Sequence, residues 1–179
     1  GHLKDYSINI EWEGMDLFRM VLKKAILRCV DFRDFLIENK ILFAFDEDIL
    51  KEGSYENISK MLTDESIKEI IKITFGEKMT PSGRGKAAYV INWILNRISD
   101  ANKDRYPRDI VDLLNESLIK EKESGNEVEN KIISHRSLLD ALTDVSSRRL
   151  HEFENDEYPS YKNIFEGFRG KKTPFEKEL

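Results

Sequence analysis

Apolar residues recur at steps of three and four along most of this chain, and this spacing restricts the fold more than any other feature. The clearest run starts near Met15, and its apolar members are Phe18, Val21, Leu22, Ala25, Ile26, Cys29, Val30 and Phe35. Steps of three and four place side chains on one face of an α-helix, whereas a half-buried strand needs strict alternation. The spacing therefore predicts one amphipathic helix from Met15 to about Ile37.

The same period predicts further helices, and their ends carry suitable start and stop residues. Thr63 can cap a helix that Gly76 closes, Pro107 and Ser134 can each begin one, and Gly170 can close a last short helix after Pro159. The residues predicted to be buried in these helices are Ile67, Ile70, Ile71, Phe75, Ala88, Ile91, Ile94, Leu95, Ile98, Ile110, Leu113, Leu114, Leu118, Leu138, Leu139, Leu142, Val145 and Leu150.

Strand signals are scarce by comparison. In YSINIEW, residues 6–12, Ile8 and Ile10 alternate with polar neighbours, which allows at most one short edge strand near the N-terminus. The 9 glycines and 4 prolines are too few for the many turns of a β-sandwich. We therefore predict an all-α fold, an irregular multi-helix bundle of about six helices.

The length of 179 residues suits one domain with its own core. Gly1 and His2, without an initiator methionine, are typical of a cleaved tag. The loop EKMTPSGRG has no apolar period and separates two helical stretches. The predicted organisation is a tag remnant and disordered start (1–5), a single helical domain (6–170) divisible into two subdomains (6–78 and 86–170), and a frayed tail (171–179).

Charge and composition exclude several classes of function. The net charge of -5 is spread among both signs without a basic stripe, so nucleic acid is an unlikely partner. No run approaches the ~20 apolar residues of a spanning helix, and no signal peptide is recognisable, so we expect a cytoplasmic protein that does not enter a membrane. The single cysteine, Cys29, cannot form an internal disulfide, and its place on an apolar stripe predicts a small buried side chain.

No complete catalytic constellation is found along the chain. PSGRGKAAY resembles a phosphate-binding loop but has Thr80 where the first glycine belongs and Ala87 where the Mg²⁺-binding hydroxyl belongs. His135 and His151 are too far apart on one predicted helix to share a metal ion. The sequence therefore predicts no metal site and no catalytic residue.

One charge is unusual for its position. Pro107 sets the first turn of a helix, and Arg108 places a full positive charge at the end that already carries the partial positive charge of the helix dipole. A bound anion between the helix start and Arg108 would remove the conflict. The alternative is an ion pair to a nearby carboxylate such as Asp104 or Asp112, and Asp109 already offsets part of the penalty.

Three segments resemble, in order, the C-terminal part of a bacterial P-loop ATPase family of the STAND and AAA-like kind, allied to the KAP group. They are INIEWEGMDLFRMVLKKAILR, INWILNRISDANKDRYPRDIVDLLNESL and SLLDALTDVSSRRLHEFENDEYPSY. The resemblance implies a helical lid and tail that follow an upstream nucleotide-binding core. By that analogy Arg108, between Pro107 and Asp109, is a sensor-type arginine for nucleotide.

The resemblance also limits what the chain does alone. Both Walker motifs and the first sensor are absent, so ATP and Mg²⁺ are implied for the parent protein, and we expect this chain to bind no cofactor by itself. Whether it acts in an enzyme depends on the upstream core.

Two other functions remain open. The chain can be a free-standing helical interaction or homo-oligomerisation domain, with Tyr158, Tyr161, Phe165 and Phe168 as its surface, unless these rings form a small core of their own. It can also be a helix-turn-helix-like DNA binder built on the helices after Pro107 and Ser134. The long connection between those helices and the acids among their arginines disfavour this last reading.

Overall fold

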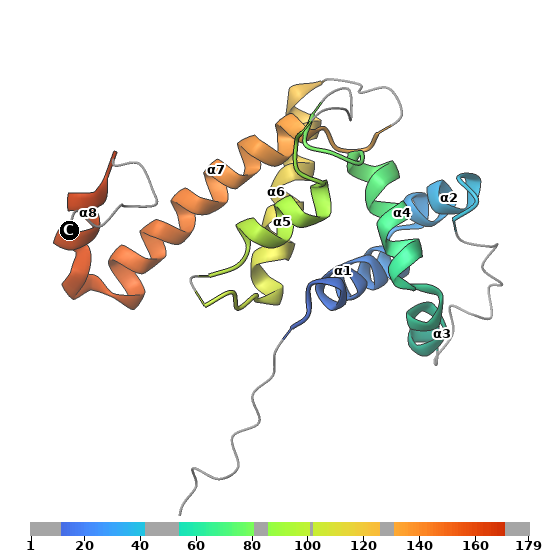
Figure 1. Ribbon diagram of the computed structural model, residues 1–179, viewed down its shortest axis with the longest axis horizontal. Helices are drawn as coiled ribbons and strands as arrows, with labels where there is room; N and C mark the ends of the chain where they lie inside the picture. Colours follow the sequence, from blue (N-terminus) through green and yellow to red (C-terminus); the bar gives the residue numbers. More distant parts are fainter. Residues whose placement is uncertain (1–11, 42–53, 81–85, 101, 126–130, 171–179) are drawn as a thin grey trace, which may run out of the picture.

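The computed structural model describes residues 12–41, 54–80, 86–100, 102–125 and 131–170 (Figure 1). Within these ranges lie eight α-helices: α1 (Gly14–Arg28), α2 (Val30–Glu38), α3 (Ser54–Met61), α4 (Asp64–Phe75), α5 (Val90–Arg97), α6 (Pro107–Ser124), α7 (His135–Glu152) and α8 (Lys162–Phe168). The described residues contain no strand and only two isolated β-bridges. The predicted all-α fold is confirmed.

Several predicted features fall on segments that the structure does not describe. The disordered start, all of the edge strand except Trp12, and the frayed tail lie outside the described residues. The same holds for residues 81–85 of the loop EKMTPSGRG.

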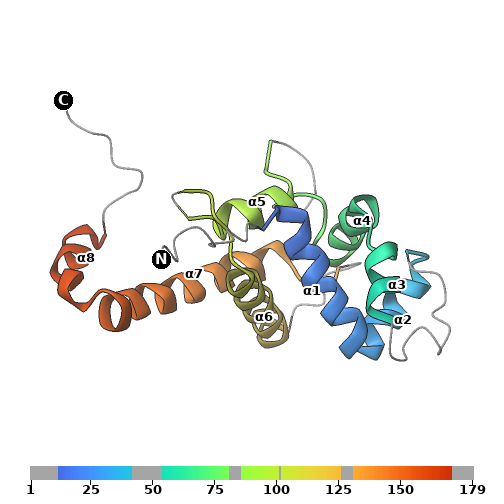
Figure 2. The same cartoon turned by 90° about the horizontal axis from the view of Figure 1, so that it is seen from below.

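The helices form an elongated arrangement (Figures 1 and 2). Helices α1 to α4 lie at one end, α5 to α7 occupy the middle, and α7 continues beyond them towards α8 at the opposite end. Helices α6 and α7, each of 18 residues, pack along one another. This packing brings the start of α6 beside the second half of α7, where the candidate site lies.

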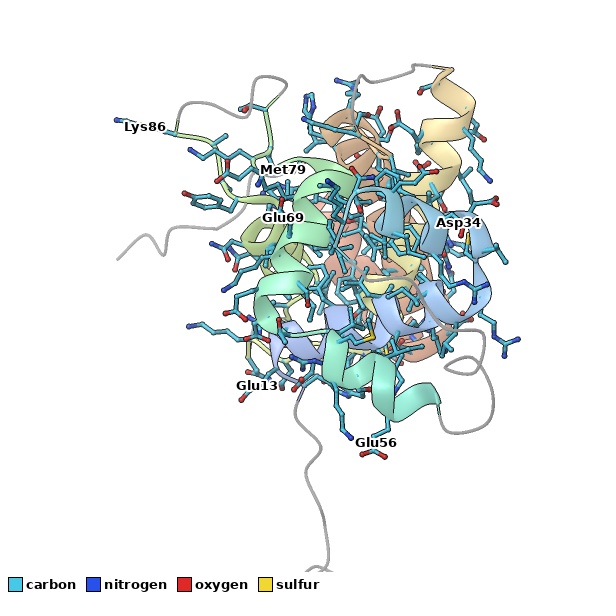
Figure 3. The ribbon with its side chains drawn as sticks, turned by 90° about the vertical axis from the view of Figure 1, so that its right-hand side faces the viewer. Glu13, Asp34, Glu56, Glu69, Met79 and Lys86 are labelled. Carbon is cyan, nitrogen blue, oxygen red and sulfur yellow. The ribbon has the colours of Figure 1, made fainter. Side chains whose placement is uncertain are left out.

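The core is one cluster of buried apolar side chains that runs from α1 to α7. Phe18 is its largest fully buried member, with 0% of its surface exposed. The buried side of α4 is the predicted one, formed by Ile67, Ile70, Ile71 and Phe75. Exposed carboxylates and amines surround this core, and Figure 3 shows Glu56 of α3 and Lys86, which precedes α5, pointing outward. Among the helices described, none has both the length and the apolar character needed to cross a membrane.

The predicted helix ends are also confirmed. The Thr63 hydroxyl accepts from the Ser66 backbone N–H at 3.3 Å, and the Ser134 hydroxyl accepts from the Ser137 backbone N–H at 3.1 Å. Pro107 is the first residue of α6. Gly76 follows α4 with a φ of 90°, a backbone angle that residues with a Cβ rarely adopt.

The predicted helix over Met15–Ile37 is wrong in one respect, because it breaks at Cys29. Cys29 has extended backbone angles, φ -117° and ψ 107°, and separates α1 from α2. The break turns the following residues away from the apolar stripe of α1. Cys29 is therefore exposed rather than buried, and so is Val30, at 56%. On α2 it is Leu36 that enters the core.

Candidate functional site

A compact loop positions the start of α6. The Asp100 carboxylate oxygen Oδ1 accepts from the backbone N–H groups of Asn102 and Asp104, both at 2.8 Å. Ser99 and Arg105 face each other across the loop in an isolated β-bridge. An aspartate that accepts from the backbone two residues onward stabilises a tight turn. The loop thus positions Pro107 and Arg108 next to the end of α5.

An open groove of about 850 Å³ lies beside this helix start. It is bounded by the end of α5, the first half of α6, the second half of α7 and the turn that follows α7. Its apolar lining consists of Ile98, Leu113, Leu142, Val145, Leu150 and Phe153. Its charged lining consists of Arg97, Arg108, Arg149, Asp100, Asp109 and Glu157.

Arg108 faces this groove with 58% of its side chain exposed, and it has partners within the chain. Its Nη2 donates to Oε1 and Oε2 of Glu152 at 2.8 and 3.0 Å, and its Nε lies 3.4 Å from Oδ2 of Asp112. Asp112 is one of the two carboxylates that the sequence suggests, whereas Glu152 is not. The unfavourable charge at the helix start is therefore already offset internally, and it does not by itself require an outside anion.

A second guanidinium shares the Glu152 carboxylate. Arg149 Nη1 donates to Glu152 Oε2 at 2.8 Å, and its Nε lies 3.8 Å from Asp109 Oδ1. The Arg149 guanidinium also lies over the Phe153 ring, 5.4 Å from the centroid. Two arginines from different helices therefore converge on one carboxylate at the edge of the groove.

The pKa values of Glu152 and Asp109 are shifted in opposite directions, each for a different reason. The hydrogen bond from Arg149, aided by the charge of Arg108, holds the pKa of Glu152 below its ordinary value of 4.5. Burial raises the pKa of Asp109, although the charge of Arg149 opposes this effect. Glu152 is therefore ionised at neutral pH and available as a partner for both guanidiniums.

The aromatic residues predicted as an interaction surface gather after α7. A π-helical turn over Phe153–Glu157 and a 3-10 turn over Pro159–Tyr161 lead into α8. Tyr158, Tyr161 and Phe168 are each about half exposed, and Phe165 is partly buried. These rings therefore do not form a closed core of their own. Tyr158 stacks on Phe153 with centroids 5.8 Å apart, which places one ring of the set beside the groove.

Two other sites were considered from sequence, a metal site and a phosphate-binding loop, and residues 81–85 of that loop lie outside the described residues. No group of three histidine, cysteine, aspartate or glutamate side chains able to hold a metal ion occurs in the part of the chain that the structure describes. Lys86 is exposed and points outward (Figure 3).

Arg149 and Glu152 are the residues that sequence reasoning missed. Their spacing of three places both on one face of α7, which is a usable signal for a charged face. The spacing does not show that this face meets Arg108, which precedes Glu152 by 44 residues.

Comparisons assign no role to this groove. No protein-family model, curated protein or solved structure matches the chain.

Proposed function

We propose that this chain is the helical lid and regulatory module of a P-loop ATPase, in which Arg108 senses nucleotide held by a core outside the chain. The observation that supports this most is the place of Arg108, in the first turn of α6, exposed, and facing an open groove. A planar guanidinium in such a place suits the terminal phosphates of a nucleotide. Pro107 presets the helical turn that presents it, and Asp109 faces Arg149.

The internal ion pairs of Arg108 are compatible with this role because its side chain is 58% exposed, so solvent screens them. Exposed pairs contribute about 0.2–1 kcal/mol each, whereas charge-assisted bonds from arginine to phosphate are stronger. A nucleotide presented by the core can therefore replace Glu152 at Arg108. The core would supply the binding of ATP and Mg²⁺, and the resemblance to ATPase lids is the reason for naming this ligand.

The packing of the helices suits a lid. Arg108 belongs to α6, which packs along α7 over its length. A tilt of α6 on nucleotide binding would therefore move α7, and with it α8 at the far end of the molecule (Figure 2).

Substitution of Arg108 in the parent protein tests the proposal. We expect Arg108→Ala to lower ATP affinity or turnover by about 10- to 100-fold, the loss corresponding to one or two charge-assisted hydrogen bonds. The measurement is steady-state ATP hydrolysis together with nucleotide binding. Arg136→Ala is the matched control, because Arg136 pairs with Asp140 on the exposed face of α7 and does not line the groove. Equal activity in wild type and both variants would exclude the sensor role.

Self-association is a second candidate function, favoured by the exposed apolar residues of α8 and of the turn before it. Tyr161, Ile164 and Phe168 are all more than half exposed and follow helical spacing. In this case the mass of the chain in sedimentation equilibrium would rise with concentration. Ile164→Glu would restore the monomer, because it places a charge on the apolar face. Asn163→Glu, next to it and already exposed, would leave association intact.

DNA binding gains no support from the geometry of α7. Its arginines Arg136, Arg148 and Arg149 each pair with a carboxylate, namely Asp140, Glu116 and Glu152. A recognition helix needs cations that remain available for phosphates.

A further inference from the structure

The carboxylate of Glu152 occupies a place suited to a phosphoryl group. It receives Arg108 Nη2 on both oxygens, at 2.8 and 3.0 Å, and Arg149 Nη1 on Oε2 at 2.8 Å. Two guanidiniums that converge from different helices form the kind of cradle that proteins use for phosphate oxygens. We infer that the Glu152 carboxylate occupies the binding place of a polyphosphate anion. Such an anion displaces Glu152 from Arg108 and Arg149 and thereby releases the turn that leads to α8.

This inference rests on the proposed function, because it assumes that the groove receives the phosphates of a nucleotide. It adds a residue that controls access to Arg108, and it adds Arg149 as the second cation. It also gives the bound anion a structural consequence at the end of the chain.

The local charge balance favours the departure of Glu152 when an anion arrives. Arg108 and Arg149 face four carboxylates within ion-pair distance, those of Asp109, Asp112, Glu152 and Glu157. An added anion would meet this acidic surplus and bind weakly as long as Glu152 stays in place. Departure of Glu152 removes the one carboxylate that both guanidiniums share, while Asp112 stays near Arg108, and Asp109 and Glu157 stay near Arg149.

The position of Glu152 connects this exchange to the last helix. It is the final residue of α7, and the π-helical turn Phe153–Glu157 follows directly. Such turns are rare and occur often at functional sites. Phe153 in this turn lies against both Arg149 and Tyr158, and the buried carboxylate of Glu154 holds Arg169 beyond α8 at 3.1 Å. Movement of Glu152 and Arg149 therefore changes the support of the whole turn and of α8.

The test is a titration of the isotope-labelled chain with inorganic tripolyphosphate, followed by nuclear magnetic resonance at constant ionic strength. We expect weak binding to wild type that shifts the amide resonances of Arg108 and Asp109 together with those of α8. Glu152→Gln keeps the shape but removes the charge. It should bind tripolyphosphate about three- to tenfold more tightly, and its α8 resonances should be displaced before any anion is added.

Glu157→Gln is the matched control. Glu157 lines the groove and carries the same charge as Glu152, but its carboxylate lies 3.9 Å from Arg149 and does not bridge the two arginines. We expect this variant to bind tripolyphosphate less than twofold more tightly, with α8 unshifted. Equal tightening by both variants would show a general charge effect and overturn the inference.

Two further outcomes separate this inference from the proposed function. Binding at Arg108 without any change at α8 would overturn the inference and leave the sensor role of Arg108 standing. Absence of binding in wild type and in Glu152→Gln, at millimolar tripolyphosphate, would overturn the inference by showing that the two arginines form no anion site in this chain. The sensor role would then be decided by Arg108→Ala in the parent protein.

Discussion

Phe18→Ala should lower the free energy of unfolding by about 3–5 kcal/mol, the usual cost of deleting a buried aromatic ring. Phe18 has 0% exposure on α1 and belongs to the core cluster that reaches α7. A domain of this size has only about 5–15 kcal/mol of stability, so the variant should be largely unfolded in moderate urea. Urea denaturation followed by far-ultraviolet circular dichroism measures the change.

Phe168→Ala provides the comparison for this prediction. Phe168 lies in α8, outside the core cluster, and is about half exposed. We expect a loss below about 1 kcal/mol there, as for most surface positions. Similar losses at the two phenylalanines would mean that the core does not lie where the structure places it.

Glu121→Gln should cost about 1–3 kcal/mol at neutral pH, because it weakens charge-assisted hydrogen bonds at the junction of α6 and α7. Glu121 Oε2 accepts from the Ser134 backbone N–H at 2.7 Å, and Ser134 is the residue that caps α7. Burial acts to raise the pKa of Glu121, but the hydrogen bonds from Ser137 and Ser134 outweigh it and hold the pKa below the ordinary 4.5.

The pH dependence of this effect follows from the direction of the shift. An acid whose pKa is lowered by folding stabilises the protein above its unfolded value, and the stabilisation disappears as the pH falls through the folded value. Wild type and variant should therefore differ most above pH 4.5 and converge in stronger acid. Glu123→Gln, on an exposed side chain of the same helix turn, should show little difference at any pH. A constant difference across the pH range would contradict the role assigned to the Glu121 charge.

Local signals in the sequence predict most of the helices. The apolar spacing of α4, the caps at Thr63 and Ser134, and the proline at the start of α6 all depend on residues within a few positions of each other. The break at Cys29 is not predicted by the apolar spacing, because the apolar period continues through this residue. Arg28 at the end of α1 and Asp31 at the start of α2 suit two helix ends, and this weaker signal marks the true boundary.

The candidate site was predicted only in part, for a related reason. Pro107, Arg108 and the i, i+4 partner Asp112 follow from helix geometry. Arg149 and Glu152 reach Arg108 only because α7 packs antiparallel to α6, which is a tertiary arrangement without a local pattern. The exposure of Tyr158 and Tyr161 has the same origin, since it depends on how far α7 extends past its neighbours (Figure 1).

The break between α1 and α2 has a practical consequence. Cys29 is the sole cysteine of the sequence, and it is exposed at the junction of two helices at the end of the molecule opposite α8. A maleimide dye or spin label would attach there at one defined point without any engineered thiol. With a second probe on α8, the distance between the two labels would report the length of the whole molecule. A change in that distance on addition of polyphosphate would measure any motion that the anion induces.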